Sequence, residues 1–233
     1  MSIDQLRANP VFAQASEPSL AKLANAARAV SYGVDQHIVA CGEPADRVFV
    51  LVAGTVRVFH RAHNGDEVVV KVLGAPAIFG EAEALPGGLP YQENVAAVGV
   101  AARVLIIPRQ AMVALLRQEP QVAYRLLLDV SHRLAIASYN ERSLAFHPPT
   151  VRLANYLLDY PCPSECRVVA LTQQQMAEAI GVSRRSVNKD ITAWKREGIV
   201  ERHSGGYRIL DAARLSNYAD SERLSLTYRL SRD

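Results

Sequence analysis

Apolar and β-branched residues come in short runs between about Arg28 and Pro108, and glycine turns separate these runs. Runs of about five residues with glycine between them are typical of β-strands. No crossover helix intervenes, so the pattern indicates an antiparallel sandwich or barrel and not a parallel α/β sheet. The predicted strands are Val48–Val52, Thr55–His60, Glu67–Leu73, Asn94–Val98 and Arg103–Ile107.

A single long helix is predicted over Pro120–Phe146, which contains no glycine and no proline after its first residue. One line of side chains recurs along it with a mean spacing of about 3.5 residues, typical of a two-stranded coiled coil. That line predicts a dimer interface of Ala123, Leu127, Val130, Leu134, Ala137, Glu141 and Leu144, with Glu141 as its polar exception. The line could instead pack on the chain's own sheet. A second, mainly apolar line is available for that packing: Val122, Leu126, Arg133 and Ile136.

The strongest pattern follows Pro148 and Pro149, where no helix can continue. An amphipathic helix around residues 153–158 precedes the segment LTQQQMAEAIGVSRRSVNKDITAWKREGIVERHSGGYRI. In this segment Thr172 and Gln175 have the spacing of a capping box, Gly181 permits a turn, and Ser183 caps a second helix. Short strands at Ile199–Arg202 and Tyr207–Leu210 follow as a wing. The order of these elements is that of a winged helix-turn-helix.

The excess positive charge of the chain lies in this part. Residues 1–147 contain 13 basic and 13 acidic side chains, whereas residues 148–233 contain 13 and 10, which gives the net charge of +3. A basic helix face is often only a solvated surface, but here it accompanies a cap, a turn and a wing, which favours double-stranded DNA as the partner. The predicted DNA-binding residues are Thr172, Gln173, Ser183, Arg184, Arg185, Ser186, Asn188 and Lys189.

The whole chain resembles the bacterial CRP/FNR family of transcription regulators. The sheet carries the resemblance at Gly42–Asp46, Val50–Gly54 and Phe79–Glu81, and the helix-turn-helix carries it at Ile180–Val187. The resemblance implies an α+β protein with an N-terminal antiparallel, jelly-roll-like β-roll of the cyclic-nucleotide-binding type, a long dimerisation helix and a C-terminal winged helix-turn-helix. The expected divisions are 1–27 for a helical segment, 28–118 for the β-roll and a short helix, 119–147 for the dimerisation helix and 148–233 for the DNA-binding domain and tail. It also implies a homodimer on a two-fold-related operator, with RNA polymerase as a further partner.

The chain departs from the family pattern in its recognition helix. The family commonly has a glutamate that accepts a hydrogen bond from cytosine, and Arg185 stands at that place. A guanidinium has no acceptor, so we expect Arg185 to bind guanine or phosphate. There is also no N-terminal cysteine cluster of the kind that iron–sulfur members use.

The resemblance places an effector pocket, either working or vestigial, at Gly80, Glu81, Gln92, Glu93, Ala137 and Ser138. In members that bind cyclic AMP, an arginine followed by serine or threonine holds the phosphate, and this pair falls on Gln92 and Glu93. The two hydroxyls offered to adenine fall on Ala137 and Ser138, so one is lost. We therefore expect no activation by cyclic AMP and no cofactor, unless Arg103 or Arg133 replaces the missing cation. Control by abundance, another small effector, and a cyclic-nucleotide-responsive or haem-responsive regulator remain alternatives.

The other chemistry-bearing residues form no predicted site. Cys162 and Cys166 have neither zinc nor common redox spacing, so loop cysteines or a redox pair are the two interpretations. His60 and His63 could meet at a turn as metal or haem ligands, or be exposed turn residues. A cupin-type enzyme would need a cluster of histidines and a carboxylate inside the barrel, and the strands carry almost none. No catalytic motif is present, and no metal site is predicted.

Composition agrees with a globular protein of one to two domains. Of the 233 residues 49% are hydrophobic and 21% are charged, and no apolar run approaches the roughly 18 residues that a membrane span needs. The N-terminus has no signal-peptide pattern, and three cysteines are too few for a disulfide framework. These features predict a cytoplasmic protein without a membrane partner.

Overall fold

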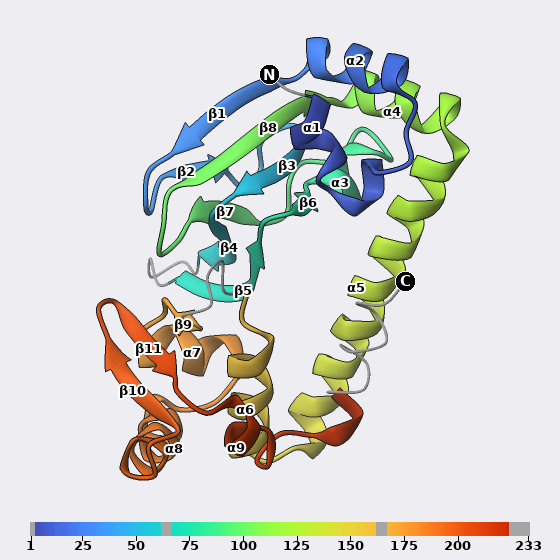
Figure 1. Ribbon diagram of the computed structural model, residues 1–233. Helices are drawn as coiled ribbons and strands as arrows, with labels where there is room; N and C mark the ends of the chain where they lie inside the picture. Colours follow the sequence, from blue (N-terminus) through green and yellow to red (C-terminus); the bar gives the residue numbers. More distant parts are fainter. Residues whose placement is uncertain (1–2, 62–66, 162–166, 224–233) are drawn as a thin grey trace. The chain divides into compact units, whose positions relative to one another are not determined.

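The computed structural model describes residues 3–61, 67–161 and 167–223 (Figure 1). The chain divides into two compact units, one made of Met1–Arg61 and Lys71–Ser131 and the other of Ala62–Val70 and His132–Asp233.

The first unit is built on antiparallel sheets, as the runs of apolar residues predict. One sheet has the strand order β1 (Arg28–Tyr32), β8 (Ala102–Pro108), β3 (Arg47–Ala53) and β6 (Ala77–Phe79). The other has the order β2 (His37–Val39), β7 (Asn94–Ala97), β4 (Thr55–Arg61) and β5 (Glu67–Gly74), of which β5 belongs to this unit from Lys71 onward. The predicted strands agree with β3, β4, β5, β7 and β8 to within one residue at each end. The predicted antiparallel fold class is thereby confirmed.

The middle of strand β3 is buried without alternation, since the four consecutive residues Val48, Phe49, Val50 and Leu51 are all at most 1% exposed. Helices cover the face that would otherwise meet water, so both faces of the strand are apolar. Helices α1 (Ile3–Arg7) and α4 (Arg109–Gln118) contact β3, and α2 (Glu17–Ala26) contacts the neighbouring strand β8; all three lie at the top of Figure 1. Two short helical turns complete the unit: η1 (Pro10–Phe12) and α3 (Glu81–Ala84).

Helix α5 (Pro120–Phe146) has the predicted bounds and passes from the first unit into the second. The first two residues of the second apolar line, Val122 and Leu126, are buried in the core of the first unit. This is the packing on the chain's own sheet for which that line was available. The seam line stays outside this core, with Leu127 60% and Leu134 66% exposed. Leu144, at the end of the seam, is also exposed, although it lies beside Gly181.

The second unit continues with α6 (Pro149–Asp159), in which proline occupies the first turn, where its missing N–H costs nothing. A helix pair, α7 (Gln173–Ala179) and α8 (Arg184–Arg196), follows. A three-stranded sheet has the order β10 (Val200–His203), β11 (Gly206–Ile209) and β9 (Val168–Val169), and α9 (Ala212–Ser216) follows the sheet. The predicted winged helix-turn-helix is therefore present.

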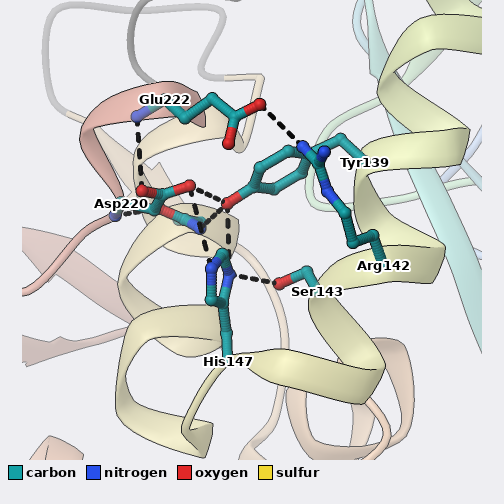
Figure 2. A network of polar contacts seen from close by, with 7 residues as sticks. Tyr139, Arg142, Ser143, His147, Asp220 and Glu222 are labelled. Carbon is teal, nitrogen blue, oxygen red and sulfur yellow. Dashed lines mark hydrogen bonds and ion pairs between the residues drawn. The ribbon is translucent and has the colours of Figure 1, made fainter.

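A polar network joins the last turns of α5 to the segment after α9 (Figure 2). The Tyr139 hydroxyl donates to Oδ2 of Asp220 at 2.5 Å and accepts from Nδ2 of Asn155 at 3.3 Å. Nδ1 of His147 lies 3.3 Å from that hydroxyl and 3.0 Å from Oγ of Ser143. The backbone N–H of Asp220 donates to Oδ1 of Asn155, so the segment is tied to both α5 and α6.

Two ion pairs flank this network. Arg142 pairs with Glu222 at 2.7 Å, and Arg223 pairs with Asp159 at 2.5 Å.

In the described ranges, no helix is both long enough and apolar enough to cross a bilayer.

Candidate nucleic-acid interface

Helix α7 begins with the predicted capping box. The Thr172 hydroxyl accepts from the backbone N–H of Gln175 at 3.2 Å, while the Gln175 side chain accepts from the backbone N–H of Thr172 at 2.9 Å. The cap satisfies two N–H groups that a helix start leaves unpaired. Because the cap fixes where α7 begins, it also fixes the positions of Thr172 and Gln173 at the start of the helix.

Helix α8 has an apolar inner face and a basic outer face. Val187, Ile191 and Trp194 are each 1% exposed, and they fix the rotation of the helix about its axis. The predicted outer residues Arg184, Arg185, Asn188 and Lys189 are exposed. Within the described ranges, no acidic side chain pairs with Arg184, Arg185 or Lys189, so their charges are available to an anion.

Asp190, the one acid among the bases of this helix, is buried with 8% exposure. It therefore leaves the outer face less neutralised than a count of charges along the sequence suggests. Ser183 caps α8 through its hydroxyl, which accepts from the backbone N–H of Ser186 at 3.2 Å and lies 2.9 Å from the Ser186 hydroxyl. Contacts of Ser183 and Ser186 with DNA stay predictions.

A second polar chain links the helix pair to the wing, and the sequence analysis missed it. Nε2 of Gln173 donates to Oδ1 of Asn188 at 3.3 Å and to the Tyr207 hydroxyl at 3.0 Å. Arg202 donates to the same hydroxyl at 3.0 Å, and its guanidinium lies over the Tyr207 ring. Of the eight predicted DNA-binding residues, Gln173 and Asn188 are thus in direct contact. The tyrosine at the start of a wing strand was the available signal, because a buried tyrosine hydroxyl needs a partner.

The predicted effector residues lie in both units. Gly80 has φ +77° and precedes α3, and Glu81 is 3% exposed at the start of that helix. Gln92 is exposed and donates to the carbonyl of Pro90, whereas Glu93 pairs with Lys71 at 3.4 Å. Ala137 and Ser138, in the second unit, are exposed on α5.

The ring of Tyr91 fills the space beside Gly80, together with Phe49: a Cβ on that glycine would lie 3.3 Å and 3.0 Å from the two rings. The Tyr91 hydroxyl donates to the carbonyl oxygen of Arg47 and accepts from its backbone N–H, which holds the ring in place. Burial raises the pKa of this hydroxyl, so it stays protonated in the ordinary pH range.

Cys162, Cys166 and His63 lie outside the described residues, and His60 is exposed at the end of β4. Among the residues that the structure describes, no three histidine, cysteine or acidic side chains are grouped to hold a metal ion.

Comparison with known proteins finds one matching domain family in each unit. Residues 29–119 match the model of the cyclic nucleotide-binding domain, and residues 151–218 match that of the Crp-like helix-turn-helix domain. A CRP-like cAMP-activated global transcriptional regulator of Mycobacterium tuberculosis is 27% identical over 225 residues, covering 93% of this chain and 100% of that protein. The global nitrogen regulator of Synechococcus elongatus is 26% identical over 182 residues, covering 75% of this chain and 82% of that protein.

Among solved structures, FixK2 of Bradyrhizobium japonicum superposes with a TM-score of 0.70 at 20% identity, covering 84% of this chain and 98% of that chain. This likeness concerns the fold. The order of the two matched domains and relatives that span nearly the whole length identify the family: the chain belongs to the CRP/FNR family of DNA-binding transcription regulators, a family of regulators and not of enzymes.

Proposed function

We propose that the protein is a homodimeric, sequence-specific regulator that acts in the cytoplasm on a two-fold-related operator and is not activated by cyclic AMP. The basic outer face of α8 is the observation that carries the DNA-binding part of this proposal. RNA polymerase is the further partner that such a regulator implies.

The outer face of α8 is suited to the major groove. Arg184 and Arg185 lie in the first turn of the helix, and Asn188 and Lys189 lie one turn further on the same side, all of them exposed. A recognition helix contacts base edges with its N-terminal residues. Arginine favours guanine through bidentate contacts to O6 and N7, so we expect a guanine in the half-site where Arg185 stands.

Dimerisation follows from the apolar residues that α5 leaves exposed. The seam leucines Leu127, Leu134 and Leu144 are more than half exposed, while Val122 and Leu126 of the opposite line are buried in the core of the first unit. A second α5 would cover them in parallel, and the two recognition helices would then meet half-sites about one turn of DNA, ~34 Å, apart.

The side chains at the predicted phosphate site argue against cyclic AMP. Gln92 offers a neutral amide where a cation would be needed, and Glu93 places a carboxylate beside it. Lys71 is already engaged by Glu93, so it would have to leave that ion pair to neutralise a phosphate. A like charge near a bound anion and a lost charge-assisted contact both weaken binding.

The test of DNA binding is a selection from randomised duplex DNA, followed by affinity measurements on arginine variants. We expect Arg184→Ala to make the free energy of binding to the selected operator less favourable by about 1–3 kcal/mol. The free energy of binding to unrelated DNA should change much less. Arg196→Ala is the matched control, because it removes an exposed arginine from the other end of α8. The assignment is wrong if the triple variant Arg184→Ala, Arg185→Ala, Lys189→Ala binds the operator as tightly as the wild type.

A further inference from the structure

The chain of hydrogen bonds from the wing to the recognition helix ends on a side chain that the proposed function uses to read DNA. We propose that Tyr207 is a positioning residue for base recognition: its hydroxyl fixes the Gln173 amide, which in turn fixes the orientation of the Asn188 amide. This inference rests on the proposed function, because it assumes that Asn188 faces a base.

Tyr207 itself is placed to act through its neighbours and not on DNA. It is 4% exposed, and it lies on the central strand of the small sheet, opposite Arg202 on β10 and Val169 on β9. The strands meet closely there, since a Cβ on the preceding Gly206 would lie 1.9 Å from the carbonyl oxygen of Val169. Hydrogen-bonded strands on both sides hold the backbone of Tyr207, so the ring presents its hydroxyl at a fixed place.

The hydroxyl is held from the wing side. A guanidinium N–H of Arg202 donates to it at 3.0 Å, and the same group lies 5.1 Å from the ring centroid. Arginine is always a donor, so the hydroxyl accepts from the wing. On the other side it contacts the half-buried Gln173 amide, whose second contact is Asn188.

Two contacts on one amide nitrogen fix both the rotamer of Gln173 and the rotation of its terminal group. The amide of Asn188 is thereby held in one of its two orientations. This matters because an asparagine amide has a donor end and an acceptor end, and a base edge distinguishes the two. An Asn188 that is free to rotate by 180° could satisfy either kind of edge, so it would still bind but would discriminate less.

The sharpest test is Tyr207→Phe in the full-length protein, assayed by selection from randomised duplex DNA with sequencing of the bound fraction. Asn188→Ala first identifies the base pair that Asn188 reads. At that base pair we expect Tyr207→Phe to reduce discrimination about two- to tenfold, the worth of one neutral hydrogen bond. Discrimination at the other base pairs and affinity for unrelated DNA should stay as in the wild type.

Tyr218→Phe is the matched control. It removes a tyrosine hydroxyl from the same unit, one that donates to Glu197 at 3.0 Å, away from Gln173 and Asn188. We expect its base preferences to equal those of the wild type. The double variant Asn188→Ala, Tyr207→Phe should discriminate as Asn188→Ala does alone, because a positioning residue has no effect once its target is gone. A general loss of stability would instead add to the effect of Asn188→Ala at every position.

Arg202→Met provides a variant on the exposed wing that leaves the ring of Tyr207 in place. We expect weaker binding to all sequences from the lost charge, together with reduced discrimination at the Asn188 base pair only. The inference is overturned if Tyr207→Phe retains wild-type discrimination there, if it relaxes all positions equally, or if Asn188→Ala leaves the selected sequence unchanged. If the wild type enriches no sequence, the proposed function fails as well.

Discussion

Tyr139 is 3% exposed on α5, yet its hydroxyl contacts side chains from three parts of the second unit. Burial and then the hydrogen bond to Asp220 raise the pKa of this hydroxyl to about 12. Burial works to raise the pKa of Asp220, but hydrogen bonds from Tyr139 and from the backbone N–H of Glu222 outweigh it, so that pKa lies below its ordinary value. The neutral phenol and the charged carboxylate thus stabilise each other.

Replacing Tyr139 by phenylalanine removes the hydrogen bond to Asp220. We expect this to lower the stability of the protein, with a defined pH dependence. At neutral pH we expect the free energy of unfolding to fall by about 1–3 kcal/mol, because Asp220 and Asn155 lose a buried partner. Above about pH 10 the hydroxyl ionises in the unfolded chain but not yet in the folded one. The contribution of the hydroxyl is therefore complete below pH 10 and is lost as the pH rises towards about 12.

Urea unfolding of both proteins at neutral pH and across this alkaline range measures the effect. The difference between wild type and variant should narrow as the pH rises. Tyr124→Phe, on the same helix but 56% exposed, should match the wild type throughout. A difference for Tyr139→Phe that stays constant with pH would contradict the assignment.

At the scale of elements, α5 has two lines of side chains with different tasks. Its buried line is apolar where it covers the first unit, at Val122 and Leu126, and becomes polar in the second unit, at Tyr139 and Ser143. Its seam line is exposed from Leu127 to Leu144. One face of α5 thus packs within its own chain, while the other leaves apolar side chains exposed. This is the arrangement expected of a helix that pairs with the same helix of a second copy.

Charges in the seam should separate the dimer. Leu127→Glu with Leu134→Glu would bury carboxylates between the paired helices, and this desolvation cost adds to the loss of the apolar contacts. Sedimentation should then give a monomer, and operator affinity should fall because both half-sites are no longer bound together. Gln121→Glu with Ala135→Glu adds the same charges to exposed positions outside the seam, and it should remain dimeric. A seam variant that still sediments as a dimer would sink the proposed interface.

The elements were largely predictable from the sequence, and their polar connections were not. The bounds of α5 follow from its lack of glycine and its flanking prolines. Strands β2 and β6 were missed because each has only 3 residues, and β1 was missed because none of its residues is buried. The partners of Tyr139 and Tyr207 lie up to 81 residues away in sequence, and no local pattern encodes such a contact. The burial of Asp190 could not be predicted either, because the positions of charged residues in a sequence do not show which of them are buried.

At the scale of the whole molecule, the predicted effector pocket decides whether a small ligand controls DNA binding. The proposed absence of a cyclic AMP response is tested by titration calorimetry, with and without operator DNA. We expect no binding in the micromolar range and less than a tenfold rise in operator affinity. Gln92→Arg with Glu93→Ser restores a cation and a hydroxyl at the predicted phosphate site, so it should gain binding. Micromolar binding by the wild type would show that the pocket argument is mistaken.

The boundary between the compact units falls within α5, before Tyr139, and not at the prolines that follow the helix. A fragment that begins at Pro148 would lack the Tyr139 hydroxyl, leaving the polar groups of Asp220 and Asn155 to water, whereas one that begins at His132 retains the network. We therefore expect a stable DNA-binding fragment to include the last turns of α5. Recombination that exchanges DNA-binding modules between related genes would preserve the Tyr139 network only when the crossover point lies upstream of the Tyr139 codon.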